Sequence, residues 1–65
     1  MKQIKAKYLK ANDIFCKEMR VTNRKSYKVL IPLSDNTLIV ENRNTGEQEE
    51  MIINKEKYVI HLRTE

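Results

Sequence analysis

The segment from Arg20 to Lys28, RVTNRKSYK, gathers positive charge around one aromatic side chain. It holds four basic residues and Tyr27, and it contains no Asp or Glu. Clustered lysine and arginine side chains bind phosphates, and an exposed tyrosine offers a surface on which single-stranded bases can stack. The segment therefore suggests a surface for a polyanion, although its centre is also typical of the solvated tip of a β-hairpin.

Further lysines in the first half of the chain extend this candidate surface. The predicted nucleic-acid-binding set consists of Lys7, Lys10, Lys17, Arg20, Arg24, Lys25 and Lys28. Residues 1 to 28 hold nine Lys and Arg against two acids, and residues 29 to 65 hold four against seven, so their net charges are +7 and −3. This asymmetry favours an anionic partner for the basic half, either nucleic acid or an acidic protein surface, unless folding interleaves the halves. The alternative is that the lysines only keep a small domain soluble.

Residue types that support catalysis or metal binding are scarce. Cys16 is the only cysteine and His61 the only histidine, which excludes an intramolecular disulfide and a Cys/His zinc site. Gly46 is the only glycine and cannot by itself form a phosphate-binding loop. Glu49 and Glu50 are adjacent in an expected strand, where neighbouring side chains point to opposite faces. We therefore expect no enzymatic activity, cofactor or metal.

Length and hydropathy predict one small domain over residues 1–65. The longest apolar run is VLIPL, residues 29 to 33, which is too short for a signal-peptide core or a membrane span. A single cysteine fits the reducing cytoplasm. A domain of this size buries only about 60 % of the surface of its unfolded chain, so additional burial against a partner remains open.

Alternation of apolar and polar residues predicts β-strands in the second half of the chain. The strand that begins at Tyr27 has an expected core-facing set of Tyr27, Val29, Ile31 and Leu33. Residues 34 to 36, Ser-Asp-Asn, predict a turn, and residues 37 to 42, TLIVEN, the next strand. Gly46 fits a hairpin loop that requires a positive φ, and residues 47 to 53 fit the return strand. After a turn at residues 54 to 56, Tyr58, Ile60 and Leu62 alternate with Val59, His61 and Arg63 in a last strand.

The N-terminal third is less regular. Residues 4 to 7 predict a short strand and residues 8 to 11 a turn or a single helical turn. Residues 13 to 21 fit a strand with Phe15, Met19 and Val21 inward, while a helix over residues 11 to 19 remains open. Together these patterns predict an all-β fold, a small antiparallel SH3-like barrel of five or six strands.

The order of these elements resembles a known class of domain. The residues that carry the resemblance are Ala6, Leu9, Asp13 and Phe15, then Tyr27-Lys28-Val29, Val40-Glu41-Asn42, Thr45-Gly46-Glu47 and Tyr58-Val59-Ile60. They are similar to SH3-like small barrels and, most closely, to the KOW-like N-terminal domain of translation elongation factor P. Asn12 stands where that family has glycine, and residues 18 to 26 lack a counterpart of its exposed lysine loop. The resemblance implies the fold and, more loosely, a connection to nucleic acid or the ribosome.

A second hypothesis is a protein-binding module. Leu30, Ile39, Ile52 and Val59 are out of phase with the expected core residues and would form an apolar sheet face. An exposed apolar face on a small chain is typical of an interface, here a homodimer or an accessory or inhibitor protein of phage or bacterial type. The alternative is that the curled sheet or the N-terminal segment covers that face.

Overall fold

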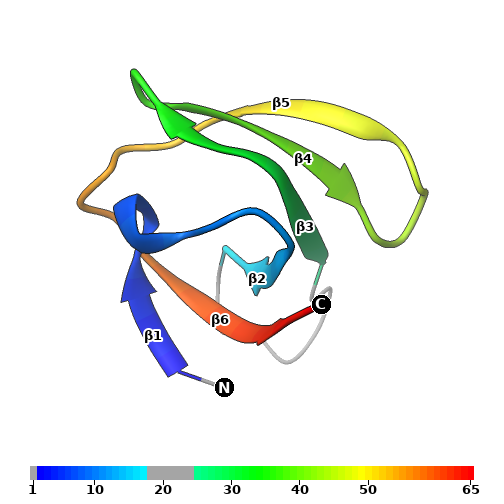
Figure 1. Ribbon diagram of the computed structural model, residues 1–65, viewed down its shortest axis with the longest axis horizontal. Helices are drawn as coiled ribbons and strands as arrows, with labels where there is room; N and C mark the ends of the chain where they lie inside the picture. The colour runs from blue at the N-terminus through cyan, green and yellow to red at the C-terminus, as the bar shows by residue number, and fades with distance from the viewer. Residues whose placement is uncertain (1, 18–24) are drawn as a thin grey trace.

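The chain folds as a single antiparallel β-sheet. The structure is a computed structural model that describes residues 2–17 and 25–65. Its elements are β1 (Lys2–Lys5), the short 3-10 helix η1 (Ala6–Tyr8), β2 (Asp13–Cys16), β3 (Ser26–Ser34), β4 (Thr37–Asn42), β5 (Gln48–Ile52) and β6 (Tyr58–Thr64). The strand order across the sheet is β1-β6-β2-β3-β4-β5 (Figure 1). The prediction of an all-β antiparallel fold is confirmed.

The N-terminal elements settle the choice left open by the sequence. Residues 13 to 16 form a strand that pairs with β3 and β6. The alternative of a helix over residues 11 to 19 is therefore wrong for residues 13 to 16. The first strand lies two residues earlier than predicted, and η1 supplies the single helical turn. The predicted inward positions Met19 and Val21 lie outside the described residues.

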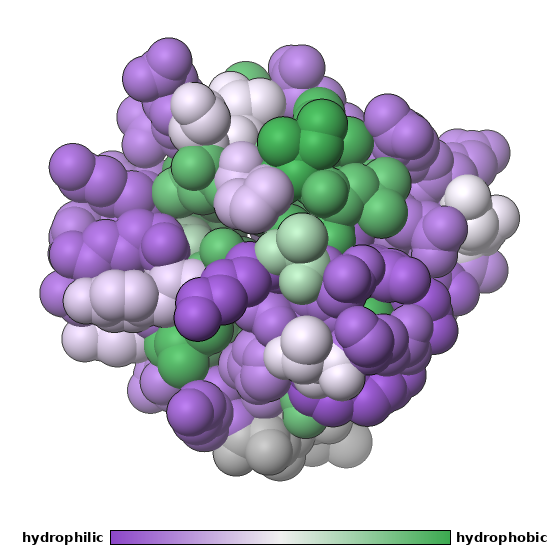
Figure 2. Space-filling model, in the orientation of Figure 1, coloured by the Kyte–Doolittle hydropathy of each residue, from purple (hydrophilic) through white to green (hydrophobic). Residues whose placement is uncertain are grey.

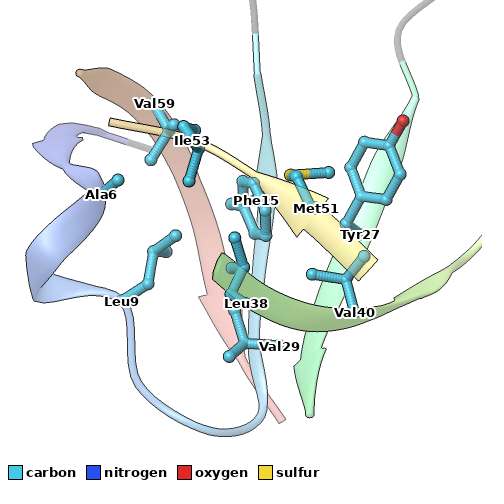
Figure 3. Packing of buried hydrophobic residues seen from close by; sticks show 10 residues of the cluster. All are labelled: Ala6, Leu9, Phe15, Tyr27, Val29, Leu38, Val40, Met51, Ile53 and Val59. Atoms are coloured by element: carbon cyan, nitrogen blue, oxygen red, sulfur yellow. The ribbon is translucent and has the colours of Figure 1, made fainter. Parts of the chain in front are cut away.

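The sheet curls around one hydrophobic core. Phe15 from β2 lies at its centre and faces Leu38 and Val40 from β4 (Figure 3). The Phe15 and Tyr27 rings are 5.7 Å apart between centroids, so Tyr27 belongs to the core as predicted. The remaining members of the cluster are Ala6, Leu9, Val29, Met51, Ile53 and Val59. Each large apolar side chain buried in this way contributes roughly 1.5–3 kcal/mol.

Two predicted hairpin turns are confirmed by their backbone conformation. Asp35 and Asn36 adopt φ values of 51° and 64° between β3 and β4, as these residue types tolerate. Gly46 has φ of 79° between β4 and β5, a conformation that glycine adopts without steric cost. These turns fix the register of the three-strand meander β3-β4-β5.

The core assignment of Ile31 is wrong because β3 contains a bulge. Val29 pairs with Val40 and Ile31 pairs with Ile39, so two steps along β3 match one step along β4. The extra residue, Leu30, moves Ile31 to the outer side, and a second irregularity in the pairing follows between Ile31 and Ser34. Ile31 is consequently 57 % exposed, although Leu33 still packs against the edge of the core.

The interface assignment of Val59 is also wrong. Val59 is completely buried in the core cluster, whereas the preceding Tyr58 is exposed. The reason is that β6 lies between β1 and β2, with Val59 opposite Ile4, so this face of β6 is turned inward. Ile60 is buried as well as Val59, so burial along β6 does not follow the strict alternation on which the prediction relied.

Candidate nucleic-acid interface

Helix η1 and the turn between β5 and β6 are joined at one end of the sheet. The amide of Ala6 donates to the carbonyl of Lys57 at 2.8 Å, and the amide of Lys7 donates to that of Lys55 at 3.1 Å. Ala6 and Leu9 are buried, which anchors η1 to the core while its polar residues stay outside. The two segments therefore lie side by side despite their separation in sequence (Figure 1).

This junction brings together lysines and tyrosines from both ends of the chain. We call the resulting surface the basic-aromatic face. It consists of Lys2, Lys5, Lys7, Tyr8, Lys10, Lys55, Lys57 and Tyr58. The β5–β6 turn is shaped by Asn54, whose side-chain oxygen accepts the Glu56 amide at 2.8 Å, so Lys55 and Lys57 flank a tight turn.

Glu56 is the acid at the centre of this face. Its carboxylate contacts Lys5 Nζ at 2.9 Å and Lys7 Nζ at 3.0 Å. Hydrogen bonds from Lys5 and then Lys7 lower the pKa of Glu56 to about 2, and the same bond to Glu56 raises the pKa of Lys5. Glu56 thus holds two lysine side chains in fixed positions while neutralising part of their charge.

Both tyrosines of the face are largely exposed and each lies beside a lysine. Tyr8 is 61 % exposed and Tyr58 52 % exposed. Lys7 Nζ lies 5.4 Å from the Tyr8 ring centroid, and Lys5 Nζ lies 5.9 Å from that of Tyr58. These distances are in the range of cation–π contacts, which hold the rings next to positive charge.

A hollow of about 430 Å³ opens between β1, η1 and the end of β6. Lys2, Lys7 and Lys10 line it together with the Tyr8 ring. The hollow therefore combines three cations with an aromatic wall, an arrangement suited to a phosphate and an adjoining flat ring.

Asp13 anchors the other side of this hollow. Its side chain is buried, with 5 % exposed. Oδ1 lies 3.1 Å from His61 Nε2 and accepts a hydrogen bond from the Thr64 hydroxyl. Oδ2 accepts a hydrogen bond from the backbone amide of Lys10 at 2.7 Å. Burial acts to raise the pKa of Asp13, but the hydrogen bonds from Thr64, Lys10 and His61 outweigh it and hold the pKa below its usual value. His61 points toward the neighbouring strand, and this network fastens β2, β6 and the base of η1.

The predicted basic residues fall into separate groups. Lys7 and Lys10 belong to the basic-aromatic face, whereas Lys17 and Lys25 lie near the Cys16–Ser26 pair at the opposite end of β2. Lys28 belongs to neither group, because Nζ is 3.7 Å from Glu65 and its β4 partner is Glu41. Arg20 and Arg24 lie outside the described residues.

Some residues of the face were missed by sequence reasoning. Lys55 and Lys57 join it only through backbone bonds between η1 and the β5–β6 turn, a contact that no local pattern encodes. Lys2 joins it by lining the hollow together with Lys7 and Tyr8. Lys5, Lys7 and Lys10 could be predicted as members of one basic surface, because lysines recur at short intervals in residues 2 to 10.

The two parts of the molecule differ in charge. Residues 26–53, which form β3, β4 and β5, hold two basic and five acidic side chains. Residues 2–17 and 54–65 hold eight basic and three acidic ones. The basic part of the fold therefore coincides only in part with the basic half of the sequence, because the β5–β6 turn and β6 join the N-terminal lysines.

The predicted apolar interface is present in part. Ile52 is 77 % exposed on β5, Leu30 is exposed in the β3 bulge, and Ile39 is half-buried on β4. Val59 is excluded from this surface by its burial.

No protein-family model, curated protein or solved structure matches the chain. Within residues 2–17 and 25–65, no three His, Cys, Asp or Glu side chains are grouped to hold a metal ion. The same residues include no helix long and apolar enough to cross a membrane.

Proposed function

We propose that this chain is a non-enzymatic module that binds single-stranded nucleic acid through the basic-aromatic face. The observation that carries the proposal is the pair of exposed rings, Tyr8 and Tyr58, each beside a lysine. Lysines alone would suit any polyanion, whereas exposed rings favour single strands, because unpaired bases can stack on them.

The charge balance of the face supports the same proposal. The face holds six lysines and one acid, Glu56, which engages only Lys5 and Lys7, and the buried Asp13 lines the adjoining hollow. The other four lysines of the face have no ion pair within the described part of the chain and are available to phosphates. They are Lys2, Lys10, Lys55 and Lys57.

The test is fluorescence anisotropy with labelled single strands of RNA and DNA about ten nucleotides long and a duplex of the same length. Each phosphate contact contributes about −0.7 to the slope of log affinity against log salt. About three contacts then predict a slope near −2, and tighter binding of single strands than of duplex.

The matched variants are Tyr8→Ala and Tyr58→Ala, with Tyr27→Phe as the control in the core. We expect each alanine variant to weaken single-strand binding about tenfold, in line with the loss of one stacked base. A flat salt response, or alanine variants that bind as tightly as the parent chain, would exclude the proposal. Binding of an acidic protein surface without nucleic-acid binding would assign the face to the alternative anionic partner.

A further inference from the structure

The outer side of β3, β4 and β5 carries an exposed apolar patch. Ile31 is opposite Ile39 across β3 and β4, and paired residues point to the same side of a sheet. Ile52 is opposite Thr37, two residues before Ile39, so it shares that side. We call Ile31, Ile39 and Ile52 the outer patch. Figure 2 shows hydrophobic surface over this part of the molecule, surrounded by hydrophilic surface.

The outer patch reaches an edge of the sheet. β5 is the last strand in the order, and within residues 2–17 and 25–65 it pairs only with β4. An edge strand presents a row of backbone N–H and C=O groups to which another strand can add. Natural edges are often protected by charged side chains, especially lysine, by proline or by a bulge; β5, with the sequence QEEMI, has no lysine, proline or bulge, and its charged side chains are the acids Glu49 and Glu50.

Acidic residues surround this edge. Glu50 is opposite Ile39 on the outer side, and Glu49 is opposite Val40 on the inner side. Glu47 and Glu50 form no ion pair with any described residue, in contrast to Glu56 and Glu65, which are bonded to lysine or arginine. The edge is therefore complementary to a basic segment.

A second copy of this chain is a poor occupant. Glu50 is the central residue of β5, so antiparallel pairing of two β5 strands in full register would place Glu50 opposite its own copy. Like charges directly opposite each other destabilise a strand pair. The charge of the edge favours a different, basic protein.

We propose that the β5 edge and the outer patch bind an extended, basic-apolar segment of another protein as an added strand. The β5 sequence specifies its pattern. An antiparallel strand would pair in turn with Ile52, Met51, Glu50 and Glu49, which calls for two apolar residues followed by two basic ones. Such a strand would bring apolar side chains against Ile52 and Met51 and cations against both glutamates.

The probe is a synthetic peptide reading Thr-Ile-Val-Lys-Lys-Thr, titrated into the isotope-labelled chain and followed by amide chemical shifts. We expect shifts confined to β5 and its β4 partners, and loss of binding when the backbone amides on the pairing side of the peptide are N-methylated. Glu50→Lys and Ile52→Lys should each weaken binding roughly tenfold. Both positions are exposed, so the variants should fold, and circular dichroism checks this.

The decisive control is a charge swap. A peptide reading Thr-Ile-Val-Glu-Glu-Thr should bind the parent chain poorly and regain binding to Glu50→Lys. Equal binding of both peptides to the parent chain, or shifts on the basic-aromatic face, would overturn the proposal. It would also be overturned if sedimentation shows a dimer of the parent chain that Ile52→Lys dissociates, because the outer patch would then be a self-interface. These outcomes do not depend on whether the chain binds oligonucleotides.

Discussion

The basic-aromatic face and the meander β3-β4-β5 use their exposed side chains in different ways. At the face, exposed tyrosines lie beside lysines, and Glu56 holds two of those lysines in place. On the meander, exposed isoleucines lie among glutamates, two of which have no ion pair in the described part of the chain. The first surface suits an anionic ligand with flat rings, and the second suits a cationic, apolar one. A small single sheet can thus present two unlike surfaces when its strand order separates the charges.

The largest expected effect is on nucleic-acid affinity. It distinguishes the lysines of the basic-aromatic face from Lys17 and Lys25. Lys10→Glu combined with Lys57→Glu should weaken binding of a single strand by about a hundredfold at low salt, because two phosphate contacts become repulsions. Lys17→Glu combined with Lys25→Glu makes the same change in net charge at the other end of β2. If the second pair weakens binding in the anisotropy assay more than the first, the nucleic acid lies near Lys17 and Lys25 instead.

The next effect concerns stability at the base of the hollow. Asp13→Asn should lower the free energy of unfolding by about 2 kcal/mol at neutral pH, because a buried carboxylate loses charge-assisted hydrogen bonds. The measurement is urea unfolding followed by circular dichroism.

The pH dependence of Asp13 has a definite sign. Its pKa is lower in the folded chain than the ordinary value of 3.8, so its contribution is present above that value. The contribution is lost as the pH falls through the lowered pKa. The stability difference between parent and Asp13→Asn should therefore shrink in acid, and a difference that stays constant would contradict the assigned network.

A smaller effect is expected at the turn of the acidic meander. Gly46→Ala should cost about 1 kcal/mol of unfolding free energy, because alanine is strained at positive φ. An added Cβ would meet no atom within 4 Å, so the cost is confined to the backbone. Gly46→Asn is the matched control and should cost less, since asparagine tolerates this conformation. An equal cost for both variants in thermal unfolding would point to a different cause.

The smallest effect is at the acid of the basic-aromatic face. Glu56→Gln should tighten single-strand binding a few-fold and steepen its salt dependence, because Lys5 and Lys7 become available to phosphates. Glu47→Gln makes the same change in charge in the β4–β5 turn, at the other end of β5 from the face, and should leave affinity nearly unchanged. Weaker binding by Glu56→Gln in the same anisotropy assay would mean that Glu56 acts mainly by positioning the two lysines.

Local signals predicted much of the fold. The turn at Asp35 and Asn36, the turn at Gly46 and the inward positions of Tyr27 and Val29 all follow from residue type and period. The phase of Ile31 could not be predicted, because the bulge that reverses it depends on pairing with β4. The phase of Val59 depends on the position of β6 between two strands that are distant in sequence.

The candidate site was less accessible to sequence reasoning than the fold. Lys7 and Lys10 were found from their charge, but Lys55 and Lys57 join them through hydrogen bonds between η1 and a remote turn. Tyr27 drew attention by its basic neighbours and proved to be core, whereas Tyr8 and Tyr58 are the exposed rings. Clustering in sequence therefore pointed to basic residues, but it did not indicate where the fold brings lysines and exposed rings together.

The central position of β6 has a consequence for how the chain folds. This strand, the last in the chain, pairs with both β1 and β2, the first two. Contacts between such distant segments close long loops and slow folding, typically to milliseconds or seconds. The meander β3-β4-β5, built from two local hairpins, can form before the ends of the chain meet. The acidic edge is therefore expected to form earlier in folding than the basic-aromatic face, which needs segments from both ends of the sheet order.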